Sequence, residues 1–205
     1  MAWASRAWAV ARAWSLDAAI ALSLTLVAVA LLTSDAYVEV PFLRNRLAVL
    51  HLLPVLTAMA LGFPLVDRTP WLTLLSPHPA LRQPLLRLGA VILVSLPLVA
   101  VLVALGWTLA AASVVLGFVG VVAPCAALLR LWYWAPMFGV LVAWAFQGPG
   151  RLAGVVGPEW RLFSAAALLL GGSLYVAAEA ARVRRVVRGA PADSEEGRAL
   201  DTIRP

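Results

Sequence analysis

Few side chains in this chain have the chemistry for catalysis, metal binding or proton transfer. The 205 residues include two His, one Cys and ten Asp or Glu, and no His or carboxylate pair has metal-ligand spacing inside an apolar segment. The motifs H-E-x-x-H, G-x-S-x-G, G-x-G-x-x-G and the P-loop do not occur in the sequence. The sequence therefore predicts a protein that is not an enzyme and holds no cofactor of its own, so that any ATP hydrolysis would reside in a partner subunit.

The polar side chains within or beside apolar segments have structural interpretations. Asp17 begins a predicted helix, where free N–H groups and the macrodipole stabilise a carboxylate. Glu179 precedes Arg182 by three residues, the spacing of an ion pair on one helix face. His51 is interpreted as a ring that reaches the headgroups, with a proton relay as the alternative. Cys125 has no second Cys to pair with and is interpreted as a small packing residue.

The composition indicates a membrane protein. Hydrophobic residues make up 63% of the chain and charged residues 13%, with a mean hydropathy of +0.92, whereas soluble domains carry about 25% charged residues. The net charge of +6 comes entirely from Arg at the ends of apolar runs, which is typical of cytoplasmic membrane flanks rather than of nucleic-acid binding.

Apolar runs predict an all-α polytopic membrane protein with six transmembrane helices. The expected spans are at about residues 16–33, 47–66, 88–106, 108–129, 131–147 and 162–181. They form a transmembrane domain over residues 16–188, with external loops at 34–46 and 148–161 and a cytoplasmic loop at 67–87. Pro97 predicts a kink in the third span, residues 106–108 predict a tight turn, and the polar tail 189–205 is expected to be disordered in the cytoplasm.

The first 15 residues predict an amphipathic helix lying in the headgroup region. Trp3, Val10 and Trp14 share one helical face, and the basic residues lie off it. A cleaved signal peptide is the alternative, although no small-x-small cleavage site stands out. The residues assigned to this interfacial helix are Trp3, Arg6, Trp8, Arg12 and Trp14.

The distribution of Arg predicts the orientation of the spans. With both termini in the cytoplasm, the outer side holds four Arg, namely Arg44, Arg46, Arg151 and Arg161. The inner side holds the other twelve, Arg6, Arg12, Arg68, Arg82, Arg87, Arg130, Arg182, Arg184, Arg185, Arg188, Arg198 and Arg204. If the fourth and fifth spans fused at residues 129–132, five spans would result and the C-terminus would lie outside.

The cytoplasmic loop contains a short apolar helix candidate. Thr69 offers an N-cap, Pro70 suits the first helical position, and Pro77 and Pro79 end the helix. Its apolar side chains are Trp71, Leu72, Leu74 and Leu75, and the charged residues around them are Asp67, Arg68 and Arg82. These residues could contact a partner, with Trp71 as the anchor; the alternative is that Trp71 only holds the loop in the headgroups.

Small residues recur at helical spacing on three predicted spans. Such faces let helices approach closely, either within a subunit or between subunits. The residues are Gly117 and Gly120 in the fourth span, Ala135, Gly139 and Ala143 in the fifth, and Gly171 in the sixth.

Aromatic residues predict membrane interfaces. Residues 132–134, Trp-Tyr-Trp, are expected in one aromatic belt, and Trp107 and Trp160 in the opposite one. For Trp144, in mid-span, stacking on a substrate is an alternative to ordinary packing.

In its topology the chain resembles permease subunits of ABC-2-type exporters, in particular small six-span permeases of actinobacterial gene clusters. The matching stretches are Trp3–Trp14, Pro70–Leu75 and Gly148–Trp160, which in that family are a connecting helix, a helix that docks the ATPase, and an external segment. The external segment here is shorter and lacks an evident second helix. The resemblance implies an exporter of two permeases and two ATPase subunits in the bacterial plasma membrane, in contact with membrane lipids and without nucleic acid.

Two other classes of protein stay open. The lack of charge in mid-span also fits a non-transport membrane protein, such as an assembly or sensor partner. A proton-coupled transporter ranks last, because it would need an ionisable residue within the membrane.

Overall fold

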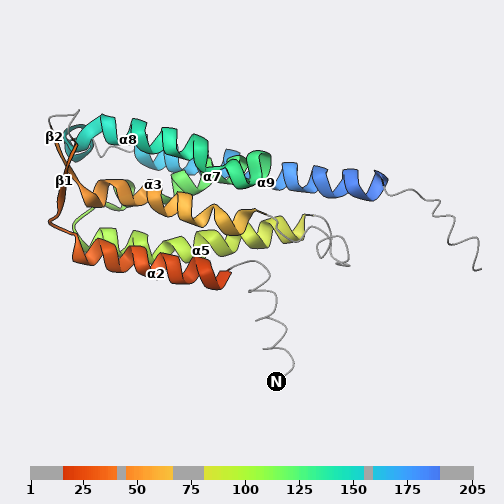
Figure 1. The fold of residues 1–205 in the computed structure, drawn as a ribbon, viewed down its shortest axis with the longest axis horizontal. Coiled ribbons are helices and arrows are strands. Elements are labelled where there is room, and N and C mark those ends of the chain that lie inside the picture. Colours follow the sequence, from red (N-terminus) through yellow and green to blue (C-terminus); the bar gives the residue numbers. More distant parts are fainter. Residues whose placement is uncertain (1–15, 41–44, 67–80, 155–158, 190–205) are drawn as a thin grey trace, which may run out of the picture.

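Antiparallel helices form almost the whole structure, a computed structural model that describes residues 16–40, 45–66, 81–154 and 159–189. The main helices are α2 (Leu16–Leu32), α3 (Val49–Leu61), α5 (Arg82–Ala104), α7 (Val114–Leu129), α8 (Trp134–Gly154) and α9 (Glu159–Gly189). Successive main helices run in opposite directions, so that α2 begins and α9 ends on the same side of the bundle (Figure 1). The predicted helical fold is thereby confirmed.

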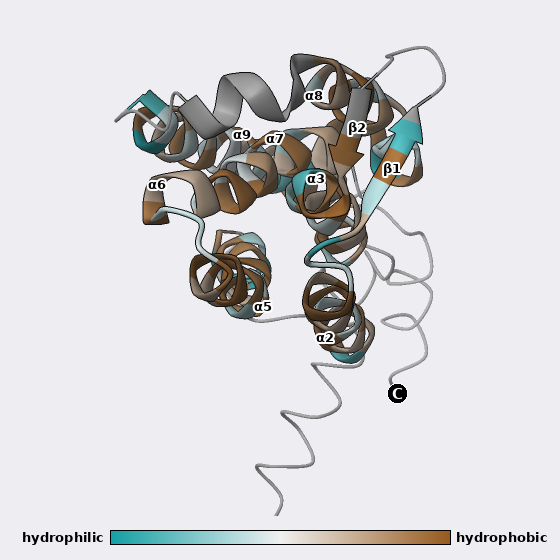
Figure 2. Ribbon diagram, turned by 90° about the vertical axis from the view of Figure 1, so that its left-hand side faces the viewer, coloured by the Kyte–Doolittle hydropathy of each residue, from teal (hydrophilic) through white to brown (hydrophobic). Residues whose placement is uncertain are grey.

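Three helices are long and apolar enough to cross a membrane: Arg82–Ala104, Leu109–Trp132 and Glu159–Arg185. Shorter apolar helices cover Leu16–Leu32, Val49–Leu65 and Trp134–Phe146. At 1.5 Å per residue, a helix of 17 residues extends about 26 Å, slightly less than the bilayer hydrocarbon of about 30 Å. The helices consist largely of hydrophobic residues (Figure 2), and many of these side chains are exposed. Six crossings therefore stay a prediction, and the three long helices indicate association with a membrane.

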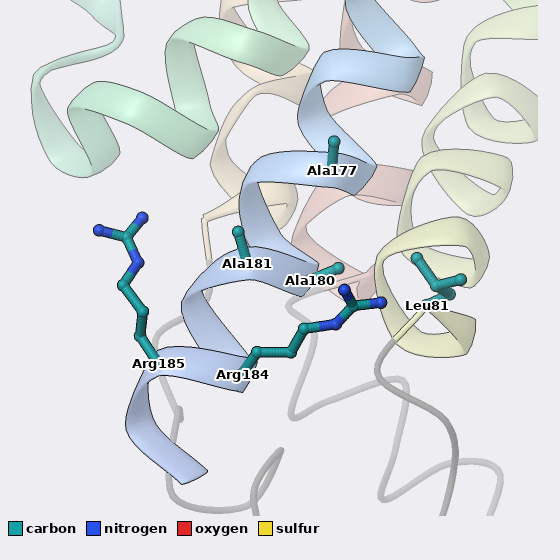
Figure 3. A pocket seen from close by; sticks show the side chains of 6 residues that line it. All are labelled: Leu81, Ala177, Ala180, Ala181, Arg184 and Arg185. Atoms are coloured by element: carbon teal, nitrogen blue, oxygen red, sulfur yellow. The ribbon is translucent and has the colours of Figure 1, made fainter. Parts of the chain in front are cut away.

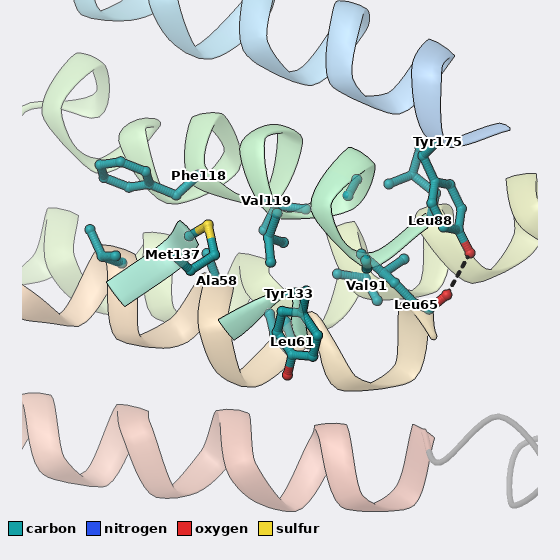
Figure 4. Packing of buried hydrophobic residues seen from close by; sticks show 14 of the residues in the cluster. Ala58, Leu61, Leu65, Leu88, Val91, Phe118, Val119, Tyr133, Met137 and Tyr175 are labelled. Atoms are coloured by element: carbon teal, nitrogen blue, oxygen red, sulfur yellow. Dashed lines mark hydrogen bonds between the residues drawn. The ribbon is translucent and has the colours of Figure 1, made fainter. Parts of the chain in front are cut away.

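The core lies where α3, α7, α8 and α9 meet. Leu61, Val119, Met137 and Tyr175 are among its fully or almost fully buried side chains (Figure 4). A second cluster joins α2, α3, α5 and α7 and includes Leu53 and Leu98. Ser23 of α2 ties these layers together, since its hydroxyl donates to the Val94 carbonyl of α5 at 2.7 Å.

Helices α7 and α9 pack with their backbones in contact. A Cβ atom on Gly120 would collide with the Ala167 carbonyl group, and one on Gly171 would collide with the Gly120 carbonyl group. On Gly117 it would lie 3.1 Å from the Cα of Ser164. Glycine is thus required at this crossing because any side chain would force the helices apart.

The expected external loop 34–46 contains a β-hairpin, which corrects the all-α prediction. Strand β1 (Tyr37–Val40) pairs antiparallel with β2 (Asn45–Ala48). The sequence Tyr-Val-Glu-Val combines β-branched and aromatic residues that favour strands. Because β2 takes residues 45–48, the second helix begins at Val49 rather than at residue 47.

Other boundaries also differ from the prediction. Helix α5 begins at Arg82, six residues before the expected span, because Pro84 lies in the first turn, where its missing N–H is harmless. Helix α8 extends to Gly154, well into the expected loop 148–161. The fourth span is divided at Ser113 into α6 (Leu109–Ala112) and α7.

Two turns have recognisable backbone chemistry. The predicted turn after α5 is confirmed: Gly106 has φ +94°, and the Trp107 N–H donates to the Leu102 carbonyl at 3.0 Å, as in a Schellman motif. After α7, Arg130 has φ 54° and ψ −118°, values typical of the first central position of a type II′ turn, which glycine usually occupies. This turn and the 3-10 helix η2 (Arg130–Trp132) separate α7 from α8, so the two helices do not fuse.

The packing of α7 on α9 leads to a comparison of two Gly→Ala substitutions. Gly171→Ala should destabilise the protein by about 1–3 kcal/mol, because the methyl group collides with the backbone of α7. Gly139→Ala should be neutral or slightly stabilising, because no heavy atom lies within 4 Å of the added methyl group. Thermal unfolding of both variants in detergent tests this pair; equal stability would contradict the close packing of α7 and α9.

Candidate functional site

Arginine side chains collect at the end of the bundle where α5 begins and α9 ends. This basic end is defined by Arg82, Arg87, Arg130, Arg182, Arg184 and Arg185. Arg82, expected in the loop, is instead the exposed first residue of α5, and Arg87 is buried in its second turn. At the opposite end, the described charged side chains include Asp35, Glu39, Glu159 and Arg161. The bundle is therefore electrically asymmetric.

The helices on both sides of residues 67–80 contact α9 near the basic end. Before them, the 3-10 helix η1 (Phe63–Leu65) ends with Leu65 fully buried, and its carbonyl accepts a hydrogen bond of 3.0 Å from the Tyr175 hydroxyl (Figure 4). After them, Leu88 of α5 packs on Gly172, where an added Cβ would lie 2.9 Å from the leucine Cδ2. Leu65, two residues before the 67–80 segment, and Leu88, eight residues after it, thus both contact one turn of α9.

The end of α7 is fastened to α9 by Arg182. Its guanidinium contacts the Glu179 carboxylate at 2.6 Å and also donates to the Ala127 carbonyl at 2.6 Å. The predicted ion pair between positions 179 and 182 is confirmed, but Glu179 is only 6% exposed. The Ala127 carbonyl lies in the last turn of α7, where no intrahelical donor is left for it. Arg182 therefore neutralises a buried carboxylate and caps a helix.

A groove of about 470 Å³ opens beside this contact, between the start of α5 and the last turns of α9 (Figure 3). Its lining residues are Leu81, Ala177, Ala180, Ala181, Arg184 and Arg185. In Figure 3 the Arg184 side chain extends toward Leu81, whereas Arg185 leaves α9 on the other side of Ala181. The groove combines a floor of small apolar side chains with two cations at its rim.

The small residues of α8 face outward. Ala135, Gly139 and Ala143 are exposed, in contrast to Gly117, Gly120 and Gly171, which lie in the contact of α7 with α9. A further apolar groove of about 590 Å³ lies between α2, the end of α3 with η1, and Tyr133, the residue before α8. It is lined by Ala18, Ala19, Ala21, Leu22, Thr25, Ala60, Phe63, Pro64 and Tyr133.

Tyr133 corrects the predicted aromatic belt. Trp132 and Trp134 are exposed and stacked, with ring centroids 5.8 Å apart. Tyr133 between them is buried, packs on Gly62, and donates its hydroxyl to the Met59 carbonyl at 2.9 Å. Because Gly62 has no side chain, there is space for this ring. The contact joins residues far apart in the chain, so the local sequence does not show it.

At the opposite end, His51 lies inside an aromatic cluster. This is contrary to the prediction that its ring reaches the headgroups. The residue is 8% exposed, and its ring lies 5.8 Å from that of Trp144 and 5.7 Å from that of Trp107. Trp144 donates its indole N–H to the His51 carbonyl at 2.6 Å. Trp160 then contacts Trp144 at 5.5 Å. Trp107 and Trp160 are thus half-buried in this cluster.

Several predicted site residues lie outside the described residues. They are Trp3, Arg6, Trp8, Arg12 and Trp14 of the interfacial helix, and Arg68, Thr69, Pro70, Trp71, Leu72, Leu74 and Leu75 of the loop. Among the described residues, no three His, Cys, Asp or Glu side chains are grouped as metal ligands.

Comparison with protein-family models, with curated proteins and with solved structures gives no match for this chain. The residues and their geometry therefore carry the functional inference.

The hydrogen bond at the root of the 67–80 segment can be tested by removing one hydroxyl. Tyr175→Phe leaves the buried Leu65 carbonyl without this donor, so the free energy of unfolding should fall by about 1 kcal/mol. Hydrogen exchange of residues 63–66 should also accelerate. Tyr37→Phe is the matched control, because Tyr37 is 64% exposed. Equal exchange and thermal unfolding in the two variants would show that this bond does not hold the root.

Proposed function

We propose that this chain is the permease subunit of an ABC-type exporter. It would form half of a translocation pathway across a bacterial plasma membrane and dock a separate ATPase through residues 67–87. The observation that carries the proposal is that η1, which precedes residues 67–80, and α5, which follows them, both contact the same turn of α9, through Tyr175 and Gly172. A partner that pushed on this segment would act directly on the longest helix of the bundle.

The basic end supports a cytoplasmic position for this segment. Arg residues flanking apolar helices are retained on the cytoplasmic side, and the described Arg side chains collect where residues 67–80 leave the bundle. The alternating directions of the main helices put the start of α2 and the end of α9 on the same side. We therefore propose six spans with both termini in the cytoplasm.

The absence of charge in the apolar stretches supports an external source of energy. Residues 18–34, 47–66, 88–129 and 162–178 contain no Asp, Glu, Lys or Arg. Proton-coupled transporters use ionisable residues within the membrane, whereas a permease driven by a separate ATPase needs none.

The exposed face of α8 supports a second permease as partner. Ala135, Gly139 and Ala143 present a surface of small residues, and Tyr133, just before α8, lines an apolar groove beside α2. Small residues let a second helix approach closely in a membrane. We place the contact between two permeases, identical or similar, on α2 and α8.

The topology can be tested by labelling single cysteines from outside intact cells. In a Cys125→Ala background, Ser34→Cys should react with an impermeant maleimide, because Ser34 lies at the end opposite the basic end. Ala192→Cys should react only after the cells are permeabilised. Labelling of Ala192→Cys in intact cells would contradict six spans.

The docking role can be tested with Trp71→Ala. If Trp71 is a buried anchor, its truncation should weaken ATPase association by about 2 kcal/mol, or roughly 30-fold. ATP hydrolysis would then proceed without transport. The measurement is co-purification with a P-loop ATPase, combined with transport in vesicles.

Trp132→Ala provides the control, because Trp132 is 67% exposed at the same end of the bundle. It should keep the ATPase bound. Normal association and transport in Trp71→Ala would exclude docking through this residue and leave an assembly or sensor role as the better proposal.

A further inference from the structure

We propose that the groove between α5 and α9 at the basic end binds an anionic phospholipid, with the phosphate at the rim that Arg184 and Arg185 form and an acyl chain along α9. The proposal requires that α9 lie in a membrane, and it holds whether or not the chain belongs to an exporter. It goes beyond general contact with lipids, because it assigns one site and one charge class of headgroup.

Two exposed cations lie at the rim of the groove. Arg184 and Arg185 are both exposed, and neither has an ion-pair partner among the residues that the structure describes. The nearby carboxylate of Glu179 is already held by Arg182 at 2.6 Å. The Arg184 guanidinium extends toward Leu81, and that of Arg185 lies on the other side of Ala181 (Figure 3), so each can donate charge-assisted hydrogen bonds to a phosphate at the rim.

The floor of the groove suits the glycerol and upper acyl region of a lipid. Ala177, Ala180 and Ala181 have short side chains, so they form a shallow depression on α9. Leu81 forms the opposing wall. A free phosphate would gain nothing from an apolar floor. In a phospholipid, an apolar acyl chain leads to a charged headgroup. The groove is complementary to this arrangement, because its apolar floor leads to two cations.

The groove continues toward the middle of α9 as an apolar stripe. Leu170, Leu174, Ala177 and Ala181 follow one another at spacings of four, three and four residues, which places them on one helical face. The two leucines are 68% and 60% exposed. From Leu174 to Arg184 the helix rises about 15 Å, which is about the hydrocarbon depth of one leaflet. The cations thus lie where a headgroup would be if an acyl chain covered the leucines.

This placement identifies the occupant. An acidic segment of a partner protein could pair with Arg184 and Arg185, but it would leave the leucine stripe in lipid and use only the rim. The anionic phospholipid is the ligand that uses the cations, the small floor and the stripe together. Bound there, it would hold Leu81, the residue that follows segment 67–80, against the last turns of α9.

The experiment measures lipid-dependent thermal stabilisation of the purified chain in detergent micelles. Dioleoyl phosphatidylglycerol should raise the unfolding temperature more than dioleoyl phosphatidylcholine, and inorganic phosphate should have no effect. Arg184→Gln should raise the half-saturating concentration of phosphatidylglycerol roughly 5-fold, and the double variant with Arg185→Gln roughly 25-fold. Arg161→Gln, at the other end of α9 and also exposed, should leave it unchanged.

A second variant separates the groove from charge alone. Ala181→Trp keeps both cations but fills the floor, so it should also weaken the preference for phosphatidylglycerol; if the double variant fails to fold, this substitution decides. Equal stabilisation by both lipids, an equal effect of inorganic phosphate, or unchanged lipid response in Ala181→Trp would each overturn the site. Loss of ATPase co-purification in the double variant, with the lipid response intact, would show a protein contact instead.

Discussion

The backbone contact between α7 and α9 is the constraint on which the rest of this structure depends. Helices in lipid gain little from hydrophobic association, because lipid tails are as apolar as the side chains, so close van der Waals packing must hold them together. Gly120 and Gly171 supply that packing by bringing peptide groups into direct contact. The crossing fixes the position of α9, and only from that position can Tyr175 reach η1 and Arg182 reach α7.

Three hydrogen bonds between helices are of the same kind: a side-chain donor near or on one helix bonds to a backbone carbonyl of another. Tyr133 binds the Met59 carbonyl, Tyr175 binds that of Leu65, and Arg182 binds that of Ala127. Each of these carbonyls lies in the last turn of its helix, where the helix itself offers no donor. Because the protein shields buried carbonyls from water, they need partners within the protein. The tyrosine hydroxyls therefore complete helix ends as well as joining helices.

The sequence shows where the helices are but not what their side chains contact. The apolar runs predict the main helices, and Gly106 predicts the turn after α5, because these signals depend on neighbouring residues alone. The boundaries at Arg82 and Gly154 differ because proline is tolerated inside the first turn of α5 and because α8 continues past its apolar part. The sequence predicts an interfacial position for Tyr133 and His51, whereas distant residues bury both side chains. The spacing of Gly117 and Gly120 indicated close packing but left the partner open.

Helix α9 joins the two chemically distinct ends of the bundle as a single stiff element. It carries Trp160 in the aromatic cluster and Arg182 at the basic end, and its 31 residues extend about 46 Å. Kinks occur at proline or at Gly and Ser pairs; α9 has no proline, and its adjacent glycines, Gly171 and Gly172, are held by α7 and by Leu88. The positions where α9 would bend most easily are thus the ones most tightly packed. The same unbent helix thus contacts η1 and Leu88 near the basic end and carries Trp160 in the aromatic cluster at the far end.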